Sequence, residues 1–151
     1  MRLQVKTALP HKERIMEEIK SVLNMERLVF DKISFDRKGF KNQNQIKYSV
    51  ETRIAQHQEA EIYRVTLILK GDKEDEYNFE ISLTGFFTFS DGVEVDDQTK
   101  KTLINNNTVA IMMPYMRSQV SLLTAQPEME CVVLPAFNIN KMVNADEGNK
   151  A

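Results

Sequence analysis

The chain has 151 residues, 42% of them hydrophobic, with 20 Lys and Arg against 22 Asp and Glu and a formal net charge of −2. This length and apolar content predict one folded domain and argue against a disordered chain. The balanced charge offers no basic stripe for nucleic acid. No apolar run approaches the roughly 20 residues of a membrane span, and no signal-peptide pattern opens the chain. We therefore expect a cytoplasmic protein that neither binds nucleic acid nor inserts into a membrane.

The N-terminal part has the pattern of an amphipathic helix. Apolar residues recur at helical spacing from Ile15 to Leu23, among Lys and Glu, which predicts a helix over about 11–24. Pro10 precedes this helix at a position that helix starts tolerate. We divide the chain into an N-terminal extension with a short strand and this helix (1–24), a main domain (25–143) and a polar tail (144–151).

The middle of the chain has the period-two alternation of β-strands. Four runs, at 26–36, 45–54, 63–70 and 77–89, place apolar side chains on one face and polar side chains on the other. Within the first run the apolar phase changes between Phe30 and Ile33, which predicts a bulge near residues 31–32. Short polar connections join the runs. The pattern predicts a four-stranded antiparallel sheet with one face in solvent.

The residues after the strands must cover the apolar face of this sheet. Asp96 or Asp97 can cap a short helix, which the run of Asn residues at 105–107 is predicted to interrupt. A long helix is expected over about 108–125, with a kink at Pro114 or a true start one residue before it. Its apolar side chains cover more than one face, which indicates packing on both the sheet and another subunit.

The chain carries no recognisable catalytic or metal-binding motif. Cys131, the single Cys, excludes an intrachain disulfide; it lies in an apolar stretch without basic neighbours, which predicts a buried, inert thiol. His11 and His57 have no Cys, Asp or Glu at metal-ligand spacing. No phosphate-binding, dinucleotide-binding or hydrolase motif occurs. We expect a protein that is not an enzyme and needs no cofactor.

Four stretches of the chain resemble the export chaperone SecB and its relatives, in the same order and spacing. These are Arg27–Asp36, which ends in Ile-Ser-Phe-Asp, then Gly85–Phe89, Pro114–Arg117 and Leu134–Asn138. The chain is similar to the SecB-like family over about residues 26–143, and its N-terminal extension is similar to that of divergent Gram-positive members of unknown function. The resemblance implies an α+β fold, a Greek-key sheet with a long C-terminal helix on one face. It also implies a homotetramer, a dimer of dimers paired through that helix.

The resemblance further implies a chaperone that holds unfolded polypeptides in an apolar groove near the crossover loop. Exposed and adaptable apolar surface suits this role better than catalytic groups do. The candidate groove residues are Phe86, Phe87, Met112, Met113, Leu134, Phe137 and Met142. In SecB, acidic residues on the exposed sheet face contact the SecA motor. Asp36 and Glu80 match two of them, but Lys32 stands where a third carboxylate is expected.

Two functions stay open at this point. The first is a general holdase for unfolded polypeptides, with or without a part in protein export. The second is an interaction module that keeps the SecB scaffold but serves one protein partner, as in toxin–antitoxin-type chaperones. The amphipathic extension motivates the second function, because such a helix could fill the groove or recruit the partner. Lys32 and the short tail depart from the family's pattern for contact with SecA. The resemblance therefore supports the client groove more than the export role.

Overall fold

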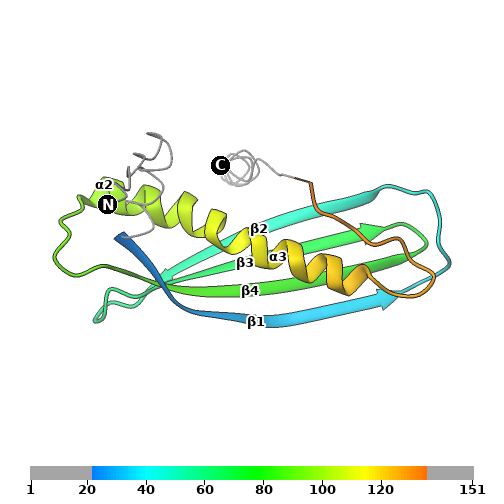
Figure 1. Ribbon diagram of the computed structural model, residues 1–151, viewed down its shortest axis with the longest axis horizontal. Coiled ribbons are helices and arrows are strands. Elements are labelled where there is room, and N and C mark those ends of the chain that lie inside the picture. Colours follow the sequence, from blue (N-terminus) through cyan, green and yellow to red (C-terminus); the bar gives the residue numbers. More distant parts are fainter. Residues whose placement is uncertain (1–21, 136–151) are drawn as a thin grey trace, which may run out of the picture.

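The computed structural model describes residues 22–135, which form a four-stranded antiparallel sheet with helices across one face (Figure 1). The strands are β1 (Leu23–Arg37), β2 (Ile46–Gln56), β3 (Tyr63–Lys73) and β4 (Tyr77–Phe89). Their order in the sheet is β1-β4-β3-β2. Consecutive hairpins join β2, β3 and β4, and β1 lies beside β4, so the connectivity is a Greek key. The residues between β1 and β2, which we call the crossover loop (38–45), connect the two edges of the sheet.

The first strand confirms the predicted bulge and corrects one boundary. The register of β1 against β4 shifts between Phe30 and Lys32, and again between Met25 and Arg27. The extra residue restores the apolar phase, as the sequence pattern required. β1 begins at Leu23, which is buried and pairs with a residue of β4, so the predicted helix over 11–24 cannot extend to its expected end. The rest of that predicted helix lies outside the described residues.

The core lies between the sheet and the helices. Its sheet side is a set of alternating β3 and β4 side chains, whose positions we call the inner face: Val65, Leu67 and Leu69 of β3, and Tyr77, Phe79, Ile81, Leu83 and Phe87 of β4. The opposite, outer face carries mostly polar residues of the same strands, with the buried Ile68 and the half-buried Phe86 as apolar exceptions. This is the one-sided burial that the period-two pattern predicted.

The helical layer is continuous where the sequence predicted an interruption. It consists of α2 (Asp97–Thr102), the π-helical segment η1 (Leu103–Asn107) and α3 (Thr108–Thr124). Asp96 caps α2 by accepting a hydrogen bond from the Thr99 N–H at 2.6 Å. The Asn residues at 105–107 do not end the helix, because a wider π-turn accommodates them. The Thr108 hydroxyl donates to the Ile104 carbonyl at 2.6 Å across the junction.

Pro114 lies inside α3, so the alternative start just before it is wrong. Proline has no N–H to donate to the carbonyl four residues earlier. Here that carbonyl belongs to Ala110, and both residues lie on the exposed side of the helix, where water can reach it. The buried side of α3 carries Val109, Met112, Met113, Met116 and Val120 at helical spacing.

The chain turns back along α3 after the helix ends. The Ser121 hydroxyl donates to the Val132 carbonyl at 2.9 Å, and the Val132 N–H donates to the Thr124 hydroxyl at 2.8 Å. These bonds turn Val132 toward the core, and the neighbouring Cys131 is exposed. The predicted buried thiol is therefore wrong, because alternation in this extended segment points Cys131 outward.

Candidate functional site

A buried ion pair ties the crossover loop to the turn between β3 and β4. Lys73 Nζ and Glu76 Oε1 are 2.9 Å apart, and both side chains are buried. The Asn42 N–H donates to the same Glu76 oxygen at 2.8 Å, and Lys73 Nζ donates to the Asn42 carbonyl at 2.9 Å. We call this Lys73–Glu76–Asn42 arrangement the loop latch. Sequence reasoning missed it, because residues 71–76 have the composition of a solvated polar turn.

The ionisation of Glu76 reflects two opposed effects. Burial disfavours its carboxylate, but the ion pair with Lys73 and the hydrogen bond from Asn42 outweigh burial and hold the pKa of Glu76 below its ordinary value. The adjacent Tyr77 has its pKa raised to about 12 by burial and by the charge of Glu76. The carboxylate of Glu76 is therefore ionised at neutral pH.

Further hydrogen bonds fix the course of the crossover loop. The Lys38 and Gly39 N–H groups donate to the Glu76 carbonyl at 2.7 and 3.1 Å. A Cβ at Gly39 would overlap the Asp75 carbonyl oxygen, so the loop passes the turn at a distance that only Gly allows. The next residue, Phe40, is 91% exposed. The loop thus holds an aromatic side chain almost entirely in water on a backbone that the latch restrains.

A hollow of about 420 Å³ lies beside the crossover loop, and we call it the loop-side hollow. Its apolar wall consists of Ile46, Tyr48, Tyr77, Val132 and Val133. Val133 is 80% exposed at this site. The first three of these side chains come from strands and the last two from the segment that returns along α3, so two separate parts of the chain build the wall.

A second hollow, of about 430 Å³, lies at the opposite end of β2, and we call it the helix-side hollow. Ile54 and Gln56 of β2, Tyr63 of β3, and Ile104 and Asn105 of η1 line it. Charged side chains of both signs complete its lining, at positions 61, 97, 100 and 101. Both hollows are therefore lined in part by side chains of β2, on the same side of the sheet as the inner face.

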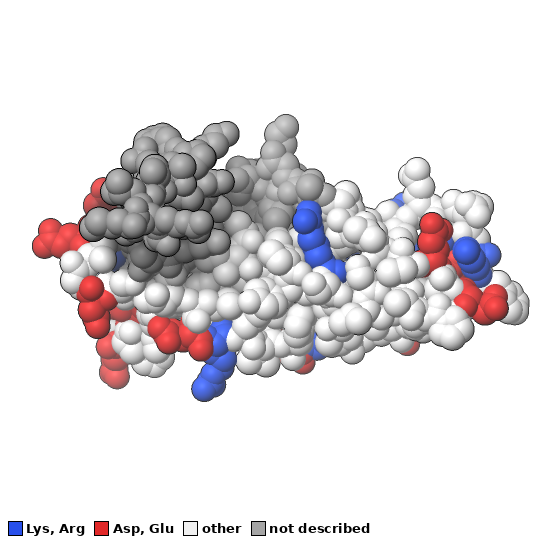
Figure 2. All heavy atoms as spheres, in the orientation of Figure 1, with Lys and Arg blue, Asp and Glu red and all other residues white. Residues whose placement is uncertain are grey.

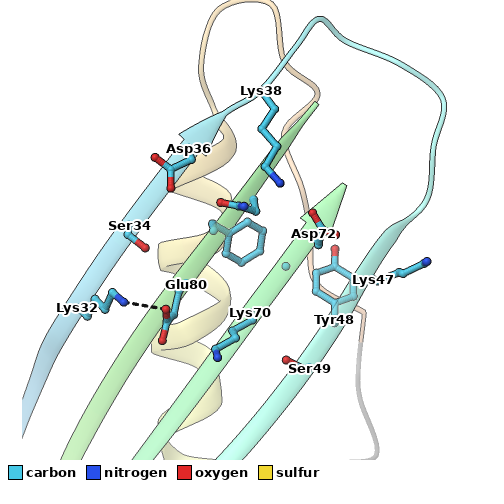
Figure 3. Close-up of a pocket in the computed structure, with 13 residues that line it drawn as sticks. Lys32, Ser34, Asp36, Lys38, Lys47, Tyr48, Ser49, Lys70, Asp72 and Glu80 are labelled. Carbon is cyan, nitrogen blue, oxygen red and sulfur yellow. Dashed lines mark hydrogen bonds and ion pairs between the residues drawn. The ribbon is translucent and has the colours of Figure 1, made fainter. Parts of the chain in front are cut away.

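The outer face of the sheet has a hollow of about 590 Å³, near the C-terminal end of β1 and the N-terminal end of β4 (Figure 3). Lys32 forms an ion pair with Glu80, with 2.8 Å between Nζ and Oε2. This hydrogen bond keeps the pKa of Glu80 below its usual range. Asp36 also lines the hollow, together with Lys38 and several other polar residues. The two residues predicted to contact a motor protein thus share one face, but Lys32 neutralises one of them.

The residues predicted to line the client groove fall into three groups. Phe87, Met112, Met113 and Leu134 are core residues, at most 7% exposed, so a client could reach them only if a helix or the 129–135 segment moved away. Phe86 is half-buried on the outer face. Phe137 and Met142 lie outside the described residues. Alternation and helical spacing identify apolar positions, but they do not tell which of these the rest of the chain covers.

None of the large apolar side chains that the structure leaves most exposed was among the predicted groove residues. The largest are Val29, Ile33, Phe40, Ile54, Val93, Tyr115, Leu122 and Val133. For Phe40 the sequence carried one signal, a Phe in an otherwise polar connection. Within residues 22–135, no three His, Cys, Asp or Glu side chains are placed to hold a metal ion. None of the helices in this range is both long and apolar enough to cross a membrane.

Comparison with known proteins identifies the class of fold. No family model matches the sequence, and no curated protein is significantly similar to it. Among solved structures, the SecB-like chaperone Rv1957 of Mycobacterium tuberculosis, in complex with a ChAD peptide from the HigA1 antitoxin, superposes with a TM-score of 0.65. The sequences are 10% identical, and the match covers 83% of this chain and 95% of the chaperone. The chain therefore has the SecB-like fold that its sequence motifs predicted.

A protein of unknown function from Streptococcus agalactiae is also similar in structure. The TM-score is 0.48 at 12% identity, over 75% of this chain and 96% of that one. This score is too low to support an argument about fold or function.

Proposed function

We propose that this protein is a chaperone that binds non-native polypeptides along β2, at the crossover loop and the two hollows, and that it is not an enzyme. The observation that carries the proposal is Phe40, a nearly fully exposed aromatic side chain on a loop restrained by the latch. Phe40 lies in the same loop as Asn44 and Gln45, which line the loop-side hollow together with the exposed Val133. Exposed apolar surface grouped in this way marks an interaction site, whereas a single exposed apolar side chain would not. The SecB-like fold adds support, since one protein of this fold was solved with a bound peptide.

The energetics fit a weak and general binder. Covering one large apolar side chain is worth about 1.5–3 kcal/mol, so Phe40 and Val133 together supply several kcal/mol to any apolar segment. Restraint of the loop by the latch reduces the entropy lost on binding. The apolar wall of the loop-side hollow suits clients recognised by apolar side chains, and the helix-side hollow adds charged side chains of both signs around Ile54, Tyr63 and Ile104.

Replacing Phe40 by Ser should weaken the binding of an unfolded client about tenfold or more, because the variant removes the exposed aromatic surface. The measurement is fluorescence anisotropy with labelled, reduced and carboxymethylated lactalbumin. Val93→Ser, another exposed apolar position in a connection, is the matched control. Both variants should keep the wild-type melting temperature. Equal affinities for the three proteins would remove Phe40 from the site.

A dedicated partner is the second candidate function. It is favoured by the peptide in the Mycobacterium tuberculosis structure, which comes from an antitoxin. Affinity capture from the native host distinguishes the two functions: many unrelated proteins at low occupancy support the general holdase, and one stoichiometric partner supports the dedicated module. The outer face gives less support to a SecA contact, because Lys32 is paired with Glu80.

We also propose that α3 pairs with a second copy of the chain in a homo-oligomer, with a tetramer as the expected form. Its exposed side carries Ile111, Tyr115, Ser118 and Leu122 at helical spacing, and Leu122 is 70% exposed. Arg117 is the one charged residue in α3. In the view of Figure 2, charged side chains gather mainly toward the two ends of the molecule. An uncharged exposed helix face of this kind suits a subunit contact.

Leu122→Glu should dissociate that oligomer, because it would bury an unpaired carboxylate in the contact. Light scattering coupled to size-exclusion chromatography measures the mass. Val93→Glu adds the same charge away from α3 and should leave the mass unchanged. A wild-type monomer, or an oligomer that survives Leu122→Glu, would contradict the assignment of this face.

A further inference from the structure

We propose that the N-terminal extension occupies the helix-side hollow of its own molecule and that an unfolded client must displace it. This inference rests on the proposed function and specifies how one part of the client site is regulated. Residues 1–21 of the extension lie outside the described residues. The described part of the chain shows where this segment joins the sheet, and that position lies beside the hollow.

Hydrogen bonds fix the end of the extension at one corner of the sheet. The Ser90 N–H donates to the Val22 carbonyl at 2.8 Å, and the Asn24 side-chain amide donates to the Ser90 hydroxyl at 3.0 Å. Leu23, between the two, is buried in the core. Val22 still has a helical backbone, so β1 begins directly after a helical turn. The extension therefore joins the sheet at a defined place.

Phe89 connects this corner with the helix-side hollow. It pairs with Leu23, and its ring lies edge to face with the ring of Tyr63, with 5.7 Å between the two centres. Lys100 Nζ lies 5.5 Å from the centre of the Phe89 ring. Tyr63 and Lys100 both line the hollow. Figure 1 shows the same proximity in the ribbon, with the start of β1 and α2 at one end of the sheet.

The extension is long enough to reach the hollow. Only β4 separates β1 from β3, so these two strands are about 10 Å apart at the usual spacing of neighbouring strands. Residues 11–21, the part of the predicted helix that precedes Val22, would form about 16 Å of helix. The segment can therefore cross the hollow without any change in β1.

Apolar side chains on the extension match the apolar surface of the hollow. Ile54 and Tyr63 contribute to that surface, and Ile54 is 42% exposed. In the extension, Ile15 and Ile19 recur with Val22 at helical spacing, so a helix would present them on one side. Covering these side chains and Ile54 removes apolar surface from water on both partners.

The charges around the hollow favour the extension over a client of arbitrary sequence. Lys100 and Lys101 lie in the lining together with Asp97 and Glu61. Residues 11–21 carry charges of both signs, and Glu18 lies next to the predicted apolar stripe. Complementary charges add specificity to an apolar contact. A segment of fixed sequence provides the same charges in every molecule, whereas an arbitrary client does not.

A weak contact is sufficient for this regulation, because the extension is part of the same chain. A tether of this length keeps its effective concentration near the hollow in the millimolar range. A site that is free only about a tenth to a third of the time binds its client about three- to tenfold more weakly than a free site. Displacement of the extension thus limits client binding without abolishing it.

The full-length double variant Ile15→Ser, Ile19→Ser tests the competition. Its affinity for reduced, carboxymethylated lactalbumin should rise about three- to tenfold, because the extension no longer fills the hollow. Arg14→Ser with Glu17→Ser changes the same predicted helix away from its apolar stripe and should leave the affinity unchanged. An unchanged or lower affinity in the Ile15, Ile19 variant would overturn the competition but leave the proposed function intact. If none of the three proteins bound lactalbumin, both would be overturned.

Amide hydrogen exchange without any client tests the place of binding. The amides of residues 15–21 should exchange at least threefold faster in Ile54→Ser than in the wild type, because the variant removes apolar surface from the hollow. Ile33→Ser is the matched control, since Ile33 is 44% exposed in β1 and does not line the hollow. Equal exchange in Ile54→Ser and the wild type would overturn the assignment to this hollow. Protection of residues 15–21 that rises with protein concentration would overturn binding within one molecule.

Discussion

Replacing Glu76 by Ala is expected to lower the free energy of unfolding by about 3–5 kcal/mol. The variant leaves the buried ammonium group of Lys73 without its carboxylate partner, and the Asn42 N–H loses its acceptor. Removing one member of a buried pair is costly, since the other member stays charged and poorly solvated. Urea denaturation followed by circular dichroism measures the change. A loss below about 1 kcal/mol would mean that the latch does not hold the crossover loop.

A double variant separates the ion pair from simple packing. Lys73→Met combined with Glu76→Leu removes both charges and keeps similar volume, so most of the lost stability should return. One oxygen of Glu76, Oε2, is buried without a hydrogen-bond partner among the described residues, which favours recovery in the double variant. A double variant as unstable as Glu76→Ala would indicate that Lys73 and Glu76 stabilise the protein through loop geometry and not through their charges.

The same pair gives a pH dependence with a defined sign. The pKa of Glu76 lies below its ordinary value in the folded protein, because its partners outweigh the effect of burial. Its contribution to stability is therefore present at neutral pH and is lost as the pH falls through the folded pKa. Acidification should destabilise the wild type more than the Lys73→Met, Glu76→Leu variant.

Phe87→Ala is expected to destabilise the protein by about 3–5 kcal/mol, whereas Phe86→Ala should change stability by about 1 kcal/mol or less. Phe87 is fully buried on the inner face, and a Cβ at Gly85 would overlap its ring, so the space around it is filled. Phe86, its neighbour in sequence, points to the outer face and is half-buried. Thermal unfolding of the two variants provides the comparison.

This pair of variants also decides how the sequence-based groove prediction should be interpreted. Both residues were predicted to contact a client, and the structure places Phe87 in the core. If Phe87→Ala were as stable as the wild type but no longer bound unfolded lactalbumin, Phe87 would belong to the client surface after all. Loss of stability with binding preserved in the folded fraction would establish it as a core residue.

The sequence predicted the sheet well because its signals are local. Period-two alternation identified four strands, and a single change of phase located the bulge between Phe30 and Lys32. The cap at Asp96 follows from residue type alone. The Asn residues at 105–107 were misleading, since their low helix propensity is a weak preference that tertiary packing overrides here through a π-turn.

The candidate site was less predictable because it depends on long-range packing. Lys73 and Glu76 lie in a charged stretch, and only contact with the crossover loop buries them. The same contact restrains the backbone on either side of Phe40. Of the predicted Met and Phe residues that the structure describes, Phe87, Met112 and Met113 are core residues, since α3 turns its Met side chains toward the sheet, and Phe86 is half-buried on the outer face. Local patterns cannot distinguish a Met that is buried in the core of one chain from a Met that lies on a client-binding surface.

The central claim, that this SecB-like fold holds non-native polypeptides, is tested most directly by light scattering during the aggregation of reduced lactalbumin. The expected result is that scattering falls as the protein is added and is largely suppressed near an equimolar ratio, while native lactalbumin shows no binding. Unchanged aggregation at a several-fold molar excess of the protein would contradict the account.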